Sequence, residues 1–530
     1  MQINLIMSEQ LKPGVQDICR VFYPAAQFTS ASQLPPVPVA ATKIPPDPPP
    51  ATGGSLAAPP EKNKETTALS LIVEPAAQTQ EGDRPQICLK GTLLLPGVTI
   101  RDSACATIDR GEDPANTTRR LARLLAYRLL EKHNGGSPTP WGIFTGIRPT
   151  KVVHRLLDSG LSPQRAGLML EQDYALSREK TALLLEVTAR QRAYLVPQAL
   201  QRTVSIYIGI PFCPSRCLYC SFPSYSIKAG ARYVQPFVEC LKREIRETGR
   251  ALARLGVRVQ TLYLGGGTPT SLAPAQLAEI LELINRCLCP QGVEEFTVEG
   301  GRPETLTEEI LRLCRDAGAN RISINPQSMH DTTLHAIGRG HSREDVLRAV
   351  ERARALHFPC LNMDVIVGLP GEGVEQVQDT MQQVTNLEPE NISVHTLALK
   401  RASLLMQSGQ RMELPSDSTV QQMHNATHFF LQQRGYAPYY LYRQKRILGQ
   451  QENTGYTQPG HTCIYNIQII EERQTILGLG CGAGSKWVRY DDWYLTSTYS
   501  PKEPAVYIER IDQIIRRQLA LLESHFGHIS

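Results

Sequence analysis

Short apolar runs alternate with amphipathic helical patterns through the middle of the chain. The first run, TVSIYIGI, begins at residue 203, and a helical pattern follows over residues 229–255. Five further runs come before residue 400, namely VQTLYL, EEFTVE, NRISIN, LNMDVIVG and NISVHTLAL. Strands that alternate with helices form right-handed crossovers and a parallel sheet. The pattern therefore predicts an α/β fold with an open, partial (β/α)6 barrel over residues 201–400, whose site lies at the carboxyl ends of the strands.

The regions on either side of this barrel have different patterns. Residues 1–116 contain strand-like runs around a proline-dense insert at about 33–66. This composition predicts a small α/β module with a disordered, dispensable insert. Residues 117–200 have helical periodicity and are predicted to form a helical connection. Residues 401–530 are assigned to a C-terminal accessory domain that covers the substrate.

Candidate chemical groups lie where the predicted strands end. Because parallel strands present their carboxyl ends at the same edge of a sheet, we expect these groups to meet in one site. They are Cys213, Cys217 and Cys220 after the first strand, Gly265–Thr270 after the second, Glu299 at the end of the third, Gln327 just past the fourth, Asp364 in the fifth and Ala398 at the end of the sixth.

Three cysteines within eight residues, Cys213, Cys217 and Cys220, are the most specific of these signals. Structural zinc usually takes four protein ligands in two separate pairs, and the sequence contains no second CxxC pair. Three unlinked buried thiols are disfavoured because the loop contains Pro214 and Arg216. Iron–sulfur clusters are held by thiolates. Three thiolates would leave one iron of a [4Fe–4S] cluster open to an added ligand, as a catalytic cluster requires.

Composition and charge narrow the class of protein. A net charge of +5 in 530 residues disfavours nucleic-acid binding, and no run of about 18 apolar residues predicts a membrane span. The N-terminal residues lack a basic segment before an apolar run, so we expect no signal peptide. The 13 cysteines are odd in number and scattered, which disfavours a disulfide framework. Together these features predict a cytoplasmic protein of a reducing compartment.

The CxxxCxxC spacing after a first strand, with Tyr219 before the last cysteine, resembles the radical S-adenosylmethionine (SAM) superfamily. The resemblance implies a [4Fe–4S] cluster on the three cysteines. Its open iron would bind SAM, which one electron cleaves to a 5′-deoxyadenosyl radical. Without the resemblance, the glycine run would be a tight turn and Glu299 a solvated strand end. The resemblance assigns binding of this SAM to Tyr207, Tyr219, Gly266, Gly267, Thr268 and Glu299.

Further motifs resemble the oxygen-independent coproporphyrinogen III dehydrogenase group, and among its members the HemZ-type branch. The motifs are YIGIPFC, GGGTPTS, RISINPQS, IGRGH and NMDVIVGLPGE for the group, and WGIFTGIRPTK, VEGGRPET and LGLGCGAGSKW for the branch. The implied reaction converts two propionates of coproporphyrinogen III into the vinyl groups of protoporphyrinogen IX, with an electron donor such as a flavodoxin or ferredoxin. A second SAM is implied at Gln327, Arg339, Asp364 and Ala398. Without the resemblance, Arg339 could form a salt bridge and Asp364 could pair inside the barrel.

Two departures leave the substrate open. Gly209 stands where better-studied members carry histidine, and Phe222 stands where they carry a further cysteine. A related branch of haem carriers has a histidine motif where this chain has Tyr465-Asn466-Ile467-Gln468. The alternatives are therefore a haem or tetrapyrrole carrier that keeps a SAM-binding cluster, and another radical SAM enzyme acting on tetrapyrroles.

Two basic segments are candidates for anion binding. PYYLYRQK, at residues 438–445, offers Arg443 and Lys445 to substrate carboxylates, the alternative being a basic surface strand. WGIFTGIRPTKVVHRLL predicts a packed turn and a helix start, unless Arg148 or Lys151 faces a ligand.

Overall fold

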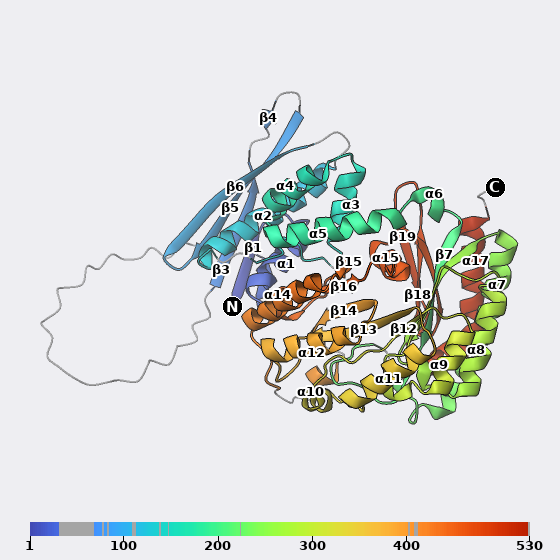
Figure 1. Ribbon diagram of the computed structural model, residues 1–530. Coiled ribbons are helices and arrows are strands. Elements are labelled where there is room, and N and C mark those ends of the chain that lie inside the picture. The colour runs from blue at the N-terminus through green and yellow to red at the C-terminus, as the bar shows by residue number, and fades with distance from the viewer. Residues whose placement is uncertain are drawn as a thin grey trace, which may run out of the picture. The chain divides into compact units, whose positions relative to one another are not determined.

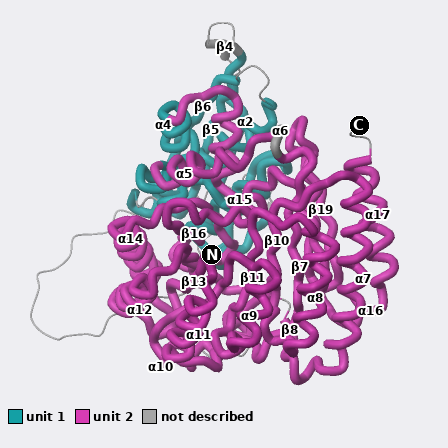
Figure 2. Tube along the Cα trace, turned by 45° about the vertical axis from the view of Figure 1, so that its right-hand side comes forward, with its two compact units in different colours: residues 1–145, 164–181 teal, residues 146–163, 182–530 magenta. Residues whose placement is uncertain are grey.

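The computed structural model divides the chain into two compact units (Figure 2). One unit comprises residues 1–145 and 164–181, and the other comprises residues 146–163 and 182–530. The four-part division predicted from sequence has other boundaries and stays a prediction. The proline-rich insert at about 33–66 lies outside the described residues, and so does the prediction that it is disordered. The described residues are 1–30, 68–76, 79–81, 84–108, 113–136, 139–146, 148–222, 224–400, 403–407 and 412–527.

The smaller unit is a six-stranded sheet packed against helices. Its strands lie in the order β2-β1-β3-β5-β4, and β6 pairs with β5. Leucines of α2 pack with Ile3, Leu5 and Leu71 in the core of this unit. The elements are β1 (Gln2–Ile6), α1 (Lys12–Phe22), β2 (Gln27–Ser30), β3 (Ala68–Pro75), β4 (Thr79–Glu81), β5 (Arg84–Leu95), β6 (Val98–Thr107), α2 (Pro114–His133) and α4 (Pro163–Tyr174).

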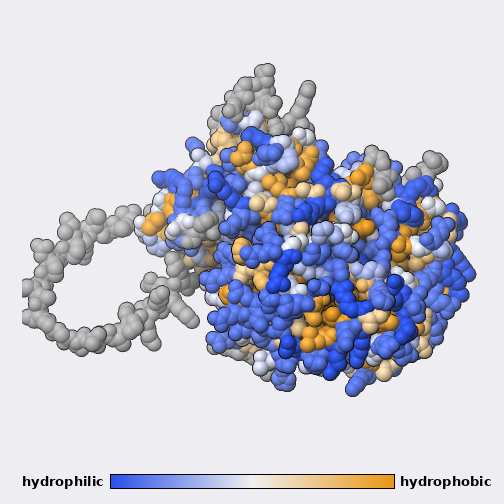
Figure 3. Space-filling model, in the orientation of Figure 1, coloured by the Kyte–Doolittle hydropathy of each residue, from blue (hydrophilic) through white to orange (hydrophobic). Residues whose placement is uncertain are grey.

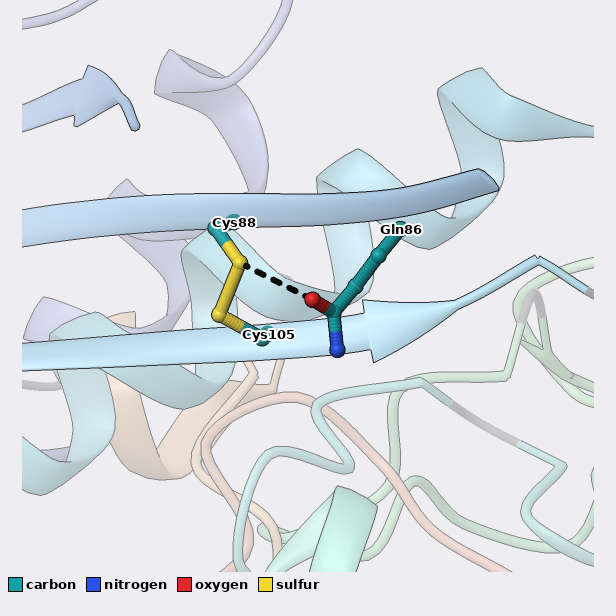
Figure 4. Close-up of a disulfide and its surroundings, with 3 residues drawn as sticks. All are labelled: Gln86, Cys88 and Cys105. Carbon is teal, nitrogen blue, oxygen red and sulfur yellow. Dashed lines mark hydrogen bonds between the residues drawn. A yellow bond between two sulfur atoms is a disulfide. The ribbon is translucent and has the colours of Figure 1, made fainter. Parts of the chain in front are cut away.

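A disulfide joins β5 to β6 through Cys88 and Cys105 (Figure 4). The two residues are direct partners in the antiparallel register, which places their side chains on the same face of the hairpin. The other eleven cysteines are free thiols. The sequence disfavours a framework of several disulfides, and a single disulfide does not contradict that prediction. The pairing of these two cysteines was not predicted.

The larger unit is built on the predicted parallel strands. Each of the six barrel strands pairs in parallel register with the next barrel strand along the chain. The strands are β7 (Thr203–Ile210), β10 (Arg258–Gly266), β11 (Glu295–Glu299), β12 (Arg321–Ser323), β13 (Cys360–Val367) and β14 (Asn391–Thr396). The intervening helices, which lie around the outside of the sheet (Figure 1), are α7 (Ala231–Leu255), α8 (Pro274–Cys287), α9 (Glu308–Asp316), α10 (Asp331–Ala336), α11 (Arg343–Ala355) and α12 (Val374–Asn386). The predicted α/β fold with an open, partial barrel is confirmed.

The C-terminal residues extend this same sheet at both ends. On one side β16 pairs with β14 and β15 with β16, while on the other β17 lies parallel to β7 and leads to β18 and β19. Residues after 401 therefore add five strands to the sheet of the barrel. Their elements are α13 (Leu404–Gln407), α14 (Asp417–Gln433), β15 (Ala437–Tyr442), β16 (Asn453–Thr457), α15 (Ile464–Glu471), β17 (Thr475–Gly480), β18 (Gly484–Val488), β19 (Leu495–Tyr499), α16 (Pro504–Glu509) and α17 (Ile511–Phe526).

One face of the parallel strands is buried, as the face covered by crossover helices must be. Ile206, Ile208, Leu262 and Leu264 are all inaccessible or nearly so and belong to one large core. The short elements that complete this part of the chain are α3 (Thr150–Asp158), α5 (Arg178–Gln191), α6 (Pro197–Leu200), β8 (Phe212–Cys213) and β9 (Tyr225–Ser226).

Hydrophilic residues cover most of the face of the molecule that Figure 3 shows, with smaller hydrophobic areas between them. Within the described ranges, no helix is both long enough and apolar enough to cross a membrane.

Candidate cluster and cofactor site

A cavity of about 630 Å³ lies in the larger unit at the carboxyl ends of the barrel strands. Its volume is in the range of small-molecule sites. The three cysteines and all ten predicted SAM-binding residues line it, so the structure brings these thirteen positions together. The ten are Tyr207, Tyr219, Gly266, Gly267, Thr268, Glu299, Gln327, Arg339, Asp364 and Ala398.

The three cysteine side chains are free thiols in a loop that is tied down at both ends. At its start β8 pairs with β9, and farther along the Leu218 amide donates to the carbonyl of Ile337 at 3.0 Å. Burial raises the pKa of Cys213 and takes that of Cys220 to about 11. Burial thus favours the protonated thiol at both positions. A thiolate forms there when a positive partner such as iron is bound.

Within the described ranges, no three Cys, His, Asp or Glu side chains surround a single ion. A cluster does not need such a group, since each thiolate binds a different iron of the cube. Three free thiols on one cavity wall, with room beside them, fit this ligand. The ligand role of each cysteine stays a prediction.

Arg302 forms a polar contact with the cysteine loop that sequence reasoning missed. Its Nη1 donates to Cys217 Sγ at 2.9 Å and its Nη2 to Ser215 Oγ at 2.7 Å, while Nε pairs with Glu304 at 2.8 Å. Only 3 % of Arg302 is exposed. Arg302 is the arginine of the VEGGRPET segment. The sequence alone does not predict its contact with Cys217, because that contact depends on the fold.

The glycine run packs directly against the cysteine loop. A Cβ at Gly267 would lie 2.5 Å from the Phe212 carbonyl oxygen and 3.0 Å from Cys213 Sγ. The amide of Gly267 donates to the Ile210 carbonyl and that of Thr268 to the Phe212 carbonyl, both at 2.7 Å. These two amides anchor the segment to the loop, and the assignment of Gly267 and Thr268 to SAM binding stays a prediction. The glycines make room for the loop.

Two carboxyl groups on the cavity wall have opposite pKa shifts. Burial and the neighbouring Asp364 carboxylate raise the pKa of Glu299 to about 8. Burial also raises the pKa of Asp364, but hydrogen bonds from His395 and Asn362 outweigh it and the pKa is lowered overall. A carboxyl group whose pKa is raised in this way can hold a proton and donate as well as accept, which suits a diol such as a ribose.

The predicted second SAM site contains buried polar atoms that lack protein partners. Among the described residues, nothing bonds Gln327 Oε1 or Arg339 Nε. The Nη1 and Nη2 atoms of Arg339 donate to the carbonyls of Gly301 and Asn325 at 3.0 and 3.1 Å. Buried polar atoms normally find partners. A polar ligand at this wall would supply them, and the second SAM stays a prediction.

Tyrosines from distant parts of the sequence form an aromatic wall of the cavity, which was not predicted from the sequence. Tyr263 stacks on Tyr465 with ring centroids 4.7 Å apart, and Tyr207 stacks on Tyr263 at 6.0 Å. From β15, at one edge of the sheet, Tyr440 and Tyr442 stack at 6.4 Å and also line the cavity. Flat apolar surfaces of this kind suit an aromatic or macrocyclic ligand.

The basic residues that the sequence assigned to substrate carboxylates do not line the cavity. Arg443 is buried and its Nη2 donates to the Gln450 carbonyl at 2.8 Å, while Lys445 is exposed. Their predicted role has no support from this placement. Arg148 and Lys151 both pair with Glu472, at 3.1 and 2.6 Å.

The family model of the radical SAM superfamily matches residues 207–384. The oxygen-independent coproporphyrinogen-III oxidase-like protein HemZ of Bacillus subtilis is 43% identical over 75% of this chain and 80% of its own length. The heme chaperone HemW of Bacillus subtilis is 32% identical over 53% of this chain and 70% of its own. Among solved structures, coproporphyrinogen III oxidase (HemN) from Escherichia coli aligns with 62% of this chain and 73% of its own, with a TM-score of 0.49 and 24% identity.

Proposed function

The chain belongs to the HemZ-like group of the radical SAM superfamily, whose members use a [4Fe–4S] cluster and SAM, and we propose that it is an oxygen-independent coproporphyrinogen III dehydrogenase of haem biosynthesis. The observation that supports this most is the cavity, which is lined by three free thiols, the candidate SAM positions and an aromatic wall. The proposal includes a cytoplasmic location and an external one-electron donor such as a flavodoxin or ferredoxin.

Different side chains would have different roles in such a reaction. Cys213, Cys217 and Cys220 would hold the cluster, and Glu299 would bind the ribose of SAM. When bound, the cluster and SAM supply one-electron chemistry that removes a hydrogen atom from unactivated carbon. Each of two propionates would lose a hydrogen atom from the carbon β to its carboxylate, then CO2 and one electron, which an external one-electron acceptor takes up, and a vinyl group is left.

The tyrosine wall has its own part in this proposal. Tyr263 and Tyr465 would hold one face of the macrocycle and keep water and other hydrogen donors away from the reacting carbon. That exclusion matters because a hydrogen-abstracting radical reacts with any weak C–H bond within reach.

A second candidate is a tetrapyrrole or haem carrier that keeps the cluster, and the HemW relatives favour it. The residues of the carrier motif argue against it. The segment Tyr465-Asn466-Ile467-Gln468 contains no histidine, and its Tyr465 stacks in the aromatic wall while Asn466 donates to the Tyr439 hydroxyl at 3.1 Å. His395 is the histidine that the described lining does contain, and it lies 3.6 Å from Asp364.

The test is anaerobic incubation of reconstituted protein with SAM, a reductant and coproporphyrinogen III. A dehydrogenase forms protoporphyrinogen IX and 5′-deoxyadenosine, which mass spectrometry detects, and a carrier binds haem without forming either. Cys217→Ala should lose the cluster iron and both products. Cys287→Ala is the matched control, because Cys287 is a free thiol outside the cavity lining. Full iron content in Cys217→Ala would contradict the ligand assignment.

A further inference from the structure

Lys486 of β18 is a cation in the cavity wall, and it has no role in the reaction proposed above. It lines the cavity, and its side chain is 14% exposed. Its Nζ donates to the carbonyl of Ile469 at 2.7 Å and pairs with Glu472 at 2.9 Å. An ammonium has three N–H donors. These two contacts use two of them, so one remains for a group in the cavity.

The acid that pairs with Lys486 is shared with two other cations. Arg148 lies 3.1 Å and Lys151 2.6 Å from the carboxylate of Glu472, which is 6% exposed. One negative charge therefore faces three positive charges. Arg148 and Lys151 are partly exposed, at 28 and 35%, so water stabilises them. Lys486 is the most enclosed of the three cations.

The surroundings of Lys486 leave its charge only partly compensated. Burial and the nearby Arg148 guanidinium lower the pKa of Lys486 to about 8, and Glu472 opposes them incompletely. A buried charge needs a partner of opposite sign. The cavity is where a further negative group can approach.

The aromatic wall continues to Lys486 through α15. Tyr465 and Ile469 are four residues apart on this helix, so they share a face, and both line the cavity. The Ile469 carbonyl holds the Lys486 ammonium. A ligand that lies against Tyr465 and Ile469 in this cavity can therefore approach the cation that Ile469 holds, which suits a flat macrocycle that carries carboxylates on its rim.

We propose that Lys486 is a carboxylate-binding subsite for a propionate of the tetrapyrrole, a role that rests on the function proposed above. Glu472 holds this ammonium, and Arg148 and Lys151, which also pair with Glu472, keep the net charge of the group positive. The same chemistry could recognise the carboxylate of SAM, so the experiment must separate these two sources.

The experiment titrates anaerobically reconstituted protein with coproporphyrin III, its tetramethyl ester and SAM, each followed by absorbance or fluorescence. Lys486→Gln should weaken coproporphyrin III binding about tenfold to hundredfold, because a charged hydrogen bond to carboxylate is lost. Binding of the tetramethyl ester, which has no carboxylates, should not change. Lys486→Arg should recover most of the affinity, because it keeps the charge.

Lys242→Gln is the matched control. Lys242 is 18% exposed and pairs with Glu279 at 2.6 Å, but it lies outside the cavity lining, so coproporphyrin III binding should stay at the wild-type level. Iron content and thermal unfolding of each variant establish that it is folded and loaded.

The outcomes separate the subsite from the proposed reaction. Unchanged coproporphyrin III affinity in a folded Lys486→Gln overturns the subsite, even if the wild type turns over. Loss of SAM affinity with retained coproporphyrin III affinity overturns it in favour of SAM. A carboxylate-dependent loss of coproporphyrin III binding supports the subsite, and it does so even if no protoporphyrinogen IX forms, a result that would reject the dehydrogenase alone.

Discussion

Arg302 places a positive charge 2.9 Å from the sulfur of Cys217. Hydrogen bonds to cluster sulfurs are one determinant of iron–sulfur reduction potentials. The donor stabilises the extra negative charge of a reduced cluster more than the oxidised state. Removing it should therefore make the cluster harder to reduce.

We expect Arg302→Gln to shift the midpoint potential of the reconstituted cluster to more negative values by tens of millivolts, where about 59 mV corresponds to a tenfold change for one electron. Arg302→Lys should shift it less. Redox titration followed by electron paramagnetic resonance measures both. Equal potentials at full iron content would show that this contact serves only to hold the loop.

Between elements, the contact of the glycine run with the cysteine loop leads to a second prediction. Gly267→Val should disturb the loop itself, because its Cβ would lie 2.5 Å from the Phe212 carbonyl oxygen and 3.0 Å from Cys213 Sγ. We expect a loss of both cluster iron and SAM binding. Gly146→Ala is the control, since a Cβ there meets nothing within 4 Å. Full iron content with weakened SAM binding would instead point to a role of this glycine toward SAM alone.

Glu244 joins three elements of the larger unit and provides a prediction for pH. This residue of α7 accepts hydrogen bonds from the Gly480 amide of β17 and the Tyr507 hydroxyl of α16, at 2.8 and 2.5 Å. Burial raises its pKa to about 7. The unfolded chain releases this proton near pH 4.5, so the folded protein loses stability from this group as pH rises from about 4.5 to 7.

The variant Glu244→Gln lacks this ionisation. Relative to wild type, it should gain stability between pH 5 and pH 8, by roughly 1.4 kcal/mol for each pH unit between pH 5 and the folded-state pKa of about 7. Calorimetric unfolding of both proteins at the two pH values measures this. A stability difference that does not change with pH would mean that Glu244 is ionised in the folded protein.

For the molecule as a whole, the topology of the smaller unit limits how much of the proline-rich insert can be removed. β2 and β3 both pair in parallel with β1, on its two sides, and the insert at about 33–66 connects them. Parallel strands need a crossover of about a dozen residues. Deletion of residues 33–66 would leave three residues between Ser30 and Ala68, which span at most about 14 Å.

We therefore expect complete deletion to abolish the pairing of β3 with β1 and to reduce the yield of folded protein. Replacement of residues 33–66 by about twelve glycine and serine residues should preserve iron content and turnover, because a chain of that length can make the crossover. Lower iron content in the replacement protein would mean that the insert does more than connect the two strands.

The barrel strands and the cysteine spacing could be predicted from the sequence, and the reason is that both are local. The apolar run of β7 and the CxxxCxxC motif that follows it involve residues within about twenty positions of one another. The order of strands and helices also predicted that the site residues meet at the carboxyl ends of the parallel strands. Thirteen of the fifteen predicted positions line the cavity, and Arg443 and Lys445 do not.

The remaining features depended on contacts between distant parts of the chain. The strand β17 pairs with β7, and the paired residues are 271 positions apart in the sequence. This pairing brings Lys486 of the next strand to the cavity. Likewise, 85 positions separate Arg302 from Cys217. Cys88 and Cys105 become partners only through the register of their hairpin. Local periodicity depends on neighbouring residues, whereas these pairings depend on which surfaces the folded chain brings together, so only the tertiary structure could decide them.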